Sequence, residues 1–188
     1  RAATTRAGPS SIRIGDALSL PFPDNYADLA LLMGPMYHLV DREDRLAALG
    51  ECRRILKRGG RLFCAAISQY ASMLDGFRSR LFDDPAFETI VDRDLAEGQH
   101  RNPGGKDYFT TAYFHAPAEL REEMVEAGLT CEKVIGVEGP WCIMNGMNEW
   151  LDERGRYYEM ALKYDRVVEE QESLIGVSFH LLAVATKQ

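Results

Sequence analysis

The stretch IRIGDALSLPFPDNYADLALLMGPMYHL, residues 12–39, decides the fold of this chain. Residues 12–14 are a short β-branched run that stops at a glycine and Asp16, so they predict a strand that ends with a carboxylate. Residues 29–33 are an uninterrupted apolar run between polar and turn-forming residues, which predicts a strand covered on both faces. Together the two runs indicate a parallel α/β sheet.

The turns that follow these two predicted strands are the first candidate for a functional site. Ligands of open α/β sheets bind beyond the carboxyl ends of the strands, so both turns are expected to share one rim. The residues that this places together are Asp16, Ala17, Gly34, Tyr37 and His38.

The remaining chain supplies further sheet and helix signals. Residues 41–57 predict a helix with Asp41 as its cap and basic residues at its end, and residues 61–67 predict a third strand. A helix over 117–127, a strand over 130–137, a charged helix over 151–173 and a final strand over 177–186 follow. Strands joined by a crossover helix form a parallel sheet with right-handed connections.

The order of these motifs resembles the class I S-adenosylmethionine-dependent methyltransferases that act on small molecules. The resemblance rests on Gly-Asp-Ala at 15–17, Leu-Pro-Phe-Pro-Asp at 20–24, Tyr-Ala-Asp at 26–28, and the apolar strand with its His-bearing loop. The turn Leu-Lys-Arg-Gly-Gly-Arg-Leu at 56–62 makes the match more specific. It covers residues 12 to about 68, and beyond them only the order of elements agrees.

The resemblance implies a fold, a cofactor and residue roles. The fold is a Rossmann-like sheet of parallel strands with an antiparallel last strand. The cofactor is S-adenosyl-L-methionine, with S-adenosyl-L-homocysteine as the product. Asp16 would accept from the adenine amino group, and Ala17, followed by Leu18 in the same turn, would offer backbone N–H. Met33 and Gly34 would flank the methionine portion of the cofactor.

One part of the family pattern has no match in the sequence. The glycine-rich loop after the family's first strand, and the acidic residue that binds the ribose, do not occur here with the required spacing. A complete member would carry at least one more βαβ unit, on the order of 30 residues or more. We therefore expect the N-terminal part of the domain to be missing from this chain.

Composition narrows the class of protein and of partner. With 188 residues, 46% hydrophobic and 27% charged, the chain fits one α/β domain over 1–188. The net charge of −7 argues against a nucleic-acid partner and favours a small neutral or cationic substrate. Without a long apolar run we expect no membrane span. The four cysteines lack metal-ligand spacing, which predicts reduced core residues, no metal site and a cytoplasmic location.

Residues 69–115 depart from the regular alternation of strand and helix. Two apolar patterns at helical spacing predict short amphipathic helices, and the loop QHRNPGGKDYFTT at 99–111 follows them. We interpret this segment as a lid that recognises the substrate, with His100, Arg101, Tyr108 and Tyr113 as candidate substrate-binding residues. The alternative is that the helices only cover the sheet or form a homodimer contact.

The expected chemistry is in-line transfer of an activated methyl group to an oxygen, nitrogen or carbon nucleophile, which depends mainly on positioning. His38 is the first candidate for a base, and Tyr37 could orient the acceptor. His100 and His115 are secondary candidates, and His180 is expected to have only a structural role within its strand. Two other classes remain open: a non-catalytic binding or regulatory domain derived from a methyltransferase, and a nicotinamide-dependent oxidoreductase.

Overall fold

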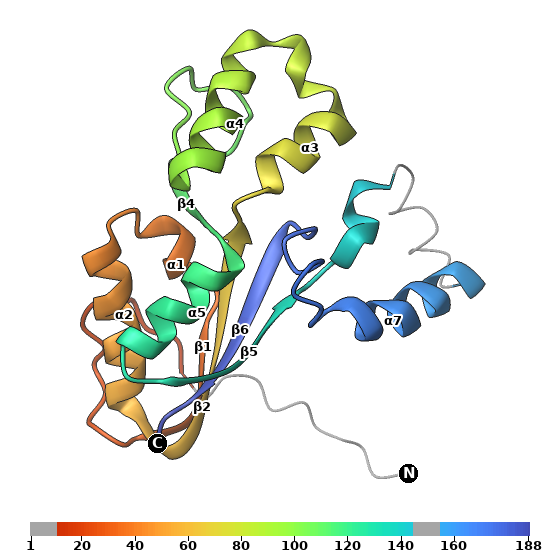
Figure 1. Ribbon diagram of the computed structural model, residues 1–188. Helices are drawn as coiled ribbons and strands as arrows, with labels where there is room; N and C mark the ends of the chain where they lie inside the picture. Colours follow the sequence, from red (N-terminus) through yellow and green to blue (C-terminus); the bar gives the residue numbers. More distant parts are fainter. Residues whose placement is uncertain (1–10, 145–154) are drawn as a thin grey trace.

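A computed structural model describes residues 11–144 and 155–188, which form a mixed sheet with helices against it (Figure 1). The strands are β1 (Ala27–Leu32), β2 (Leu56–Ser68), β3 (Gln99–His100), β4 (Ala112–His115), β5 (Thr130–Gly136) and β6 (His180–Thr186). The order is β3-β4-β2-β6-β5, and β1 also pairs with β2. The prediction of a mixed α/β sheet with an antiparallel last strand is confirmed.

Strand β2 is the centre of the sheet. On one side it pairs in parallel with β1 along its first part, where Leu29 lies opposite Arg61, and with β4 at its end. On the other side it pairs antiparallel with β6. Ile67, near the carboxyl end of β2, therefore lies between Phe114 of β4 and His180 of β6. Because directly paired residues point to the same face of a sheet, these three side chains form one row.

The helices form two groups around the sheet. The elements are α1 (Pro35–His38), α2 (Arg42–Ile55), α3 (Ala71–Ser79), η1 (Leu81–Asp83), α4 (Pro85–Glu97), α5 (Pro117–Glu126), η2 (Gly139–Ile143) and α7 (Arg156–Val168). Helices α2 and α5 contact each other and pack on the sheet, whereas α3 and α4 project beyond the carboxyl ends of β2 and β4 (Figure 1). None of the described helices combines the length and apolar content needed to cross a bilayer.

The main core lies between the sheet and the pair α2 and α5. Its buried side chains come from all of these elements at their expected periodicity, and they include Leu49, Cys52, Leu62, Cys64, Leu120, Met124, Val134, Leu181, Ala183 and Ala185. A smaller cluster at the carboxyl end of the sheet contains Ile67, Ala71, Ala112 and Phe114. The four cysteines are free, and Cys131 is only half-buried, whereas the other three are core residues as predicted.

The strand predicted over residues 12–14 is not formed. Ile12 and Ile14 are fully exposed, and no described strand pairs with this segment. A β-branched composition gives only a preference for extended backbone, and a strand also needs a hydrogen-bonded neighbour. The expectation that β1 is covered on both faces is also wrong, because Leu29 and Leu31 are 51% and 63% exposed.

The boundary between the first long helix and the next strand also differs from the prediction. Helix α2 ends at Ile55, and the residues expected to complete it, up to Lys57, begin β2 instead. Leu56 pairs with Ala27 of β1, and further along β2 Gly59 N–H donates to Lys187 O at 2.7 Å. Asp41 stands at the predicted cap position, but its side chain accepts no capping hydrogen bond. The helix predicted over 151–173 is observed as α7, but it ends at Val168, and residues 151–154 lie outside the described part.

A buried charged cluster joins α2, β4 and α5. The guanidinium of Arg45, which is 1% exposed, donates to Glu123 through Nε at 3.0 Å and Nη2 at 2.8 Å. His115 Nε2 lies 3.2 Å from Glu123 Oε2, and Arg45 Nη1 donates to Val40 O at 2.9 Å. Burial works to raise the pKa of Glu123, but hydrogen bonds from His115 and Arg45 outweigh it and lower that pKa. The cluster therefore fixes the segment after α1 against the sheet.

Replacing Glu123 with Ala should lower the free energy of unfolding by about 3 to 5 kcal/mol, because it leaves the Arg45 charge buried without a counter-ion. Urea unfolding followed by far-UV circular dichroism measures the change. Glu122→Ala is the matched control, since Glu122 precedes it on the same helix but is exposed, and its effect should stay within about 0.5 kcal/mol. Equal losses in the two variants would contradict the importance of the buried pair.

Candidate functional site

A cavity of about 410 Å³ lies at the carboxyl end of the sheet, between the row centred on Ile67 and the segment 69–115. We call this space the insertion cavity. The strands contribute Ile67, Phe114 and His180 to it, and Phe179 directly precedes β6. The other described lining residues come from the insertion, namely Ala71, Ser72, Asp75, Leu81, Phe87, His100, Asp107, Tyr108 and Phe109. The predicted helices of the insertion thus do reach over the end of the central strand.

Aromatic rings form the walls of the insertion cavity. The rings of Phe87 and Tyr108 meet edge to face at 4.9 Å, and the imidazole of His100 stacks on Phe114 at 4.7 Å with 15° between the planes. Phe109 has a φ of 76°, a conformation that costs energy for a non-glycine residue, and Asn102 Nδ2 donates to its carbonyl at 3.0 Å. Such walls suit a flat apolar ligand.

Behind the wall, His100 forms a buried pair with Asp94 of α4. His100 Nδ1 lies 2.8 Å from Asp94 Oδ2, and its Nε2 lies 2.8 Å from the carbonyl oxygen of Tyr108. The hydroxyl of Ser72 donates to the same Asp94 oxygen at 2.6 Å. Both ring nitrogens therefore face hydrogen-bond acceptors. His100 is therefore occupied in holding β3, α3 and α4 together.

The loop that carries Tyr108 is attached to the start of α4. Asp84 caps this helix by accepting from Ala86 N at 3.1 Å, and it also accepts from Tyr108 Oη at 2.7 Å and from Lys106. The hydrogen bonds from Lys106 and Tyr108 lower the pKa of Asp84 to about 2. Asp84 thus links this loop to the start of α4.

The structure separates the four predicted substrate-binding residues. His100 and Tyr108 line the insertion cavity. Arg101 lines a neighbouring cavity of about 210 Å³ on the other side of the loop, together with Tyr108. Tyr113 is buried under the guanidinium of Arg45, 3.6 Å from its ring centroid, and its hydroxyl bonds to Glu119. These roles in substrate binding remain predictions.

The predicted cofactor residues lie in two places. Asp16, Ala17 and Leu18 form a turn in which Leu18 N–H donates to Asp16 Oδ1 at 2.9 Å, so Asp16 does not end a strand as expected. The turn leads to Leu20, whose N–H donates to Glu51 Oε2 of α2 at 2.7 Å. Met33 and Gly34 follow β1 and lead directly into α1.

The predicted catalytic residues both belong to α1. Tyr37 packs against the small cluster that contains Ile67 and Phe114, so it lies beside the floor of the insertion cavity. His38 is exposed, and its ring centroid is 4.8 Å from that of Tyr37. Of the two, Tyr37 packs against residues that line the insertion cavity, and the roles of Tyr37 in orienting the acceptor and of His38 as a base remain predictions.

A second histidine at the insertion cavity was not predicted from the sequence. The strand expected over 177–186 begins only at His180. This residue is therefore the first of the strand, at the rim of the sheet, and not in the middle of the strand. Its side chain lines the cavity and bonds to Glu138. A signal was present, because His180 directly precedes the apolar run Leu-Leu-Ala-Val-Ala.

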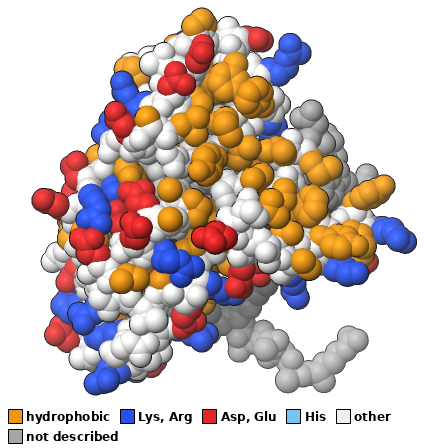
Figure 2. Space-filling view, viewed as in Figure 1, with side chains coloured by type: hydrophobic (Ala, Val, Ile, Leu, Met, Phe, Trp, Pro, Cys, Tyr) orange, Lys and Arg blue, Asp and Glu red, His pale blue; other side chains and the backbone are white. Residues whose placement is uncertain are grey.

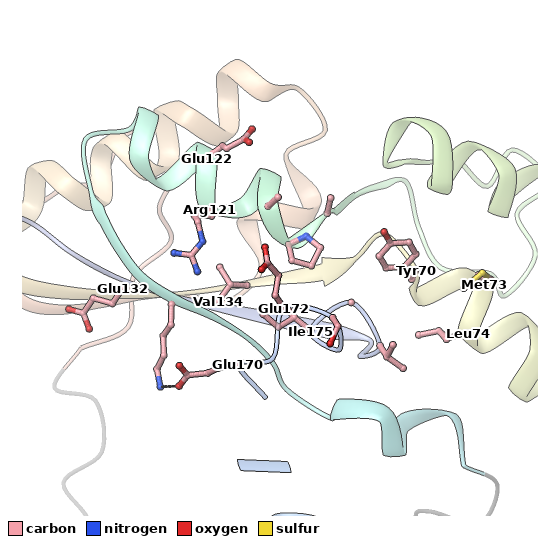
Figure 3. Close-up of a pocket in the computed structure, with 17 residues that line it drawn as sticks. Tyr70, Met73, Leu74, Arg121, Glu122, Glu132, Val134, Glu170, Glu172 and Ile175 are labelled. Atoms are coloured by element: carbon pink, nitrogen blue, oxygen red, sulfur yellow. Dashed lines mark hydrogen bonds and ion pairs between the residues drawn. The ribbon is translucent and has the colours of Figure 1, made fainter. Parts of the chain in front are cut away.

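A larger groove of about 860 Å³ lies between α3, the start of α5, β5 and residues 170–177 (Figure 3). Its charged side chains largely satisfy one another or the backbone: Lys133 Nζ pairs with Glu170 at 2.6 Å, and Arg121 donates to Cys131 O at 3.3 Å. Within residues 11–144 and 155–188, no group of three His, Cys, Asp or Glu side chains is placed to hold a metal ion. We therefore take the insertion cavity as the candidate site.

The surface divides into an apolar and a charged region. Figure 2 shows hydrophobic side chains in a band over α3, η2 and α7, whereas acidic and basic side chains gather over α2 and α5. Exposed members of the apolar band include Phe77, Ile143 and Leu162. The insertion thus belongs to the apolar side of the molecule.

Comparison with known sequences links the first part of the chain to one family. Residues 1–64 match the family model described as a methyltransferase domain. The ubiquinone/menaquinone biosynthesis C-methyltransferase UbiE of Caulobacter vibrioides (strain NA1000 / CB15N) is 40% identical over 104 residues, which is 50% of this chain and 40% of that protein. UbiE of Caulobacter sp. (strain K31) is 43% identical over 77 residues, 41% of this chain and 28% of that protein. The chain thus spans less than half the length of these relatives.

Comparison with solved structures extends the likeness to the fold of almost the whole chain. An S-adenosylmethionine-dependent methyltransferase from Mesorhizobium loti matches with a TM-score of 0.55 at 16% identity, covering 96% of this chain and 72% of that one. A SAM-dependent methyltransferase from Methanosarcina mazei matches with a TM-score of 0.53 at 16% identity, covering 93% and 66%.

Replacing Asp94 with Asn should lower the free energy of unfolding by about 1.5 to 3 kcal/mol, because the amide loses the charged hydrogen bond to His100. Chemical denaturation at neutral pH measures the loss. Asp92→Asn, an exposed position on the same helix, removes the same charge without a buried partner and should have little effect. If the two variants were equally stable, the Asp94 and His100 pair would not hold the insertion together.

Proposed function

We propose that this chain, which belongs to the class I S-adenosylmethionine-dependent methyltransferases, transfers a methyl group to a small molecule bound in the insertion cavity. The observation that carries the proposal is the position of this cavity. It lies at the carboxyl end of β2, with Tyr37 of α1 packed beside its floor, where open α/β sheets bind their ligands. The acceptor atom is an oxygen, nitrogen or carbon nucleophile.

Residues of this chain fit two parts of the cofactor. Asp16 is exposed on its turn, and only one of its carboxylate oxygens is used, by Leu18 N–H. The other oxygen is available to accept from the adenine amino group. Met33, 49% exposed, and Gly34 offer an apolar residue and a small residue for the methionine portion. When bound, the cofactor supplies a methyl group that is already activated on a sulfonium.

The side chains around the cavity would hold and shield the acceptor. Tyr37 is suited to orient it, because its ring belongs to the cluster under the cavity floor. The insertion 69–115 serves as a lid, since α3, α4 and the loop with Tyr108 cover the space and exclude water from the transfer. Among the described residues that line the cavity there are two carboxylates and no lysine or arginine, which supports a neutral or cationic small molecule over an anionic one.

Asp16→Ala should weaken the binding of S-adenosyl-L-homocysteine by roughly 1 to 3 kcal/mol, because the adenine amino group loses its acceptor. Isothermal titration calorimetry of the full-length protein measures the dissociation constant. Asp28→Ala is the control, since Asp28 is an exposed carboxylate paired with Lys57 and should bind the product as the wild type does. An unchanged constant in Asp16→Ala would remove Asp16 from the cofactor site, and no binding by the wild-type protein would refute the proposed function.

A further inference from the structure

We propose that His180, held by Glu138, is the general base of the insertion cavity and that the acceptor is an uncharged aromatic compound with a hydroxyl group. The proposal rests on the methyl-transfer function above, and it names the base and the acceptor class of that site. Four features carry it: the geometry of the His180 and Glu138 pair, its place in the sheet, the state of the other lining groups and the nature of the walls.

Glu138 fixes the imidazole of His180 from the turn after β5. One carboxylate oxygen, Oε1, accepts from His180 Nδ1. The other, Oε2, accepts from the backbone N–H of His180 at 2.9 Å and from the hydroxyl of Ser178 at 2.7 Å. The backbone N–H of Glu138 in turn donates to Ser178 Oγ at 3.0 Å. The carboxylate therefore has little freedom to turn, and it fixes the tautomer of the ring.

The free nitrogen of His180 is the one that a base requires. With Nδ1–H donated to Glu138, the neutral ring carries its lone pair on Nε2. Nε2 has no hydrogen-bond partner in the described part of the chain, and the side chain is 50% exposed. His180 lines the cavity in the same row as Ile67 and Phe114. The lone pair is thus accessible at the site itself.

The other titratable groups that line the cavity are less suited to this role. His100 uses both ring nitrogens, for Asp94 and for the carbonyl of Tyr108. Asp75 accepts from Ser79 Oγ at 2.8 Å. The remaining ones, Asp107 and Tyr108, belong to the loop, and Tyr108 donates its hydroxyl to Asp84. Outside the lining, the guanidinium of Arg78 lies 5.6 Å from the ring of Phe179.

The walls and charges of the cavity favour a neutral aromatic hydroxyl. Rings of Phe87, Tyr108, Phe109 and Phe114 can stack on a planar acceptor. The carboxylates of Asp75 and Asp107 would repel an acceptor that is already anionic. An aromatic hydroxyl meets both conditions, but it is a weak nucleophile until it loses its proton, so it needs a base within reach.

The transfer then balances without any further reagent. The hydroxyl oxygen forms a bond to the methyl carbon, the bond from that carbon to sulfur breaks, and its electron pair stays on sulfur to give the neutral thioether. The hydroxyl proton moves to Nε2 of His180, and the resulting imidazolium is paired with Glu138. The proton leaves to solvent after product release, since the ring is half exposed.

The pair predicts a pH dependence. The hydrogen bond to Glu138 raises the pKa of His180, although burial opposes it. Burial works to raise the pKa of Glu138, but hydrogen bonds from His180 and Ser178 lower it to about 2. The carboxylate is therefore ionised throughout the neutral range, and His180 becomes a competent base only as the pH rises through its raised pKa. Removing the charge of Glu138 should move this limb of the rate profile to lower pH.

The experiment uses 4-nitrophenol as acceptor probe with the full-length protein and saturating S-adenosyl-L-homocysteine. The visible absorbance of its ionised form reports where the bound probe loses its proton, without any need for turnover. We expect the bound probe to ionise at lower pH than the free one, and His180→Asn to abolish this shift. Glu138→Gln should reduce the shift. Glu132→Gln, at the far end of β5, is the control and should leave it intact.

Turnover gives the second measurement. With S-adenosyl-L-methionine, methylation of the probe should fall by about 10²-fold or more in His180→Asn, while S-adenosyl-L-homocysteine binds as in the wild type. A loss confined to His38→Asn would assign the base to His38 and overturn the proposal. Failure of the probe to bind would overturn the acceptor class. If binding of S-adenosyl-L-homocysteine is normal and both His180 measurements equal the wild type, His180 is not the base, and the methyltransferase function still stands.

Discussion

The antiparallel pairing of β6 with β2 is the constraint on which the rest of the site depends. Parallel strands bring only their last residues to the carboxyl rim of a sheet. An antiparallel strand brings its first residue there, and β6 begins with His180 opposite Ile67. The antiparallel pairing of β5 with β6 puts the end of β5 next to the start of β6, where Val137 N–H donates to His180 O at 2.9 Å. This hydrogen bond and the one from the backbone N–H of His180 hold the carboxylate of Glu138 beside the imidazole of His180.

The alternation of side chains along β2 separates two environments at this rim. The row of Phe114, Ile67 and His180 faces the insertion cavity. The next row contains Ser68 and His115, and His115 joins the buried cluster with Arg45 and Glu123. Neighbouring residues of one strand thus face different surroundings: Phe114 lines the aromatic cavity, and His115 belongs to the buried charged cluster. The cluster fixes the segment after α1 through Val40, and with it the turn that carries Tyr37.

The apolar patterns of the sequence predicted those helices and strands that depend mainly on residues close together in the chain. Apolar periodicity was sufficient to predict α2, α3, α4 and α5, and an apolar run predicted the position of β1, although Leu29 and Leu31 of β1 and Phe77 of α3 are exposed. The periodicity also predicted two helices between the third predicted strand and residue 115, where α3 and α4 lie. The same patterns failed where pairing decides: residues 12–14 have a strand composition but no neighbouring strand among the described residues, and Leu56, expected in the helix, pairs with Ala27 at the start of β2 instead.

The site was harder to predict because its decisive contacts join distant residues. Arg45 looks like a solvated helix residue in its sequence, yet it is buried by Glu123, 78 positions away. Glu138 and His180 are separated by 42 positions. Neither residue stands in a recognisable motif, so only the fold reveals that one restrains the other.

This long-range construction also bears on how the site would work. The walls of the insertion cavity come from residues 67–114, whereas the free imidazole nitrogen comes from β6 near the end of the chain. The cavity and the imidazole that we propose as its base therefore come together only when residues 69–115 and the last strand are both in place. The pair Asp94 and His100 stabilises the first of these parts, and Glu138 stabilises the second. The imidazole of His180 is half exposed, and it borders a space that aromatic rings line, which is where we propose that the acceptor binds.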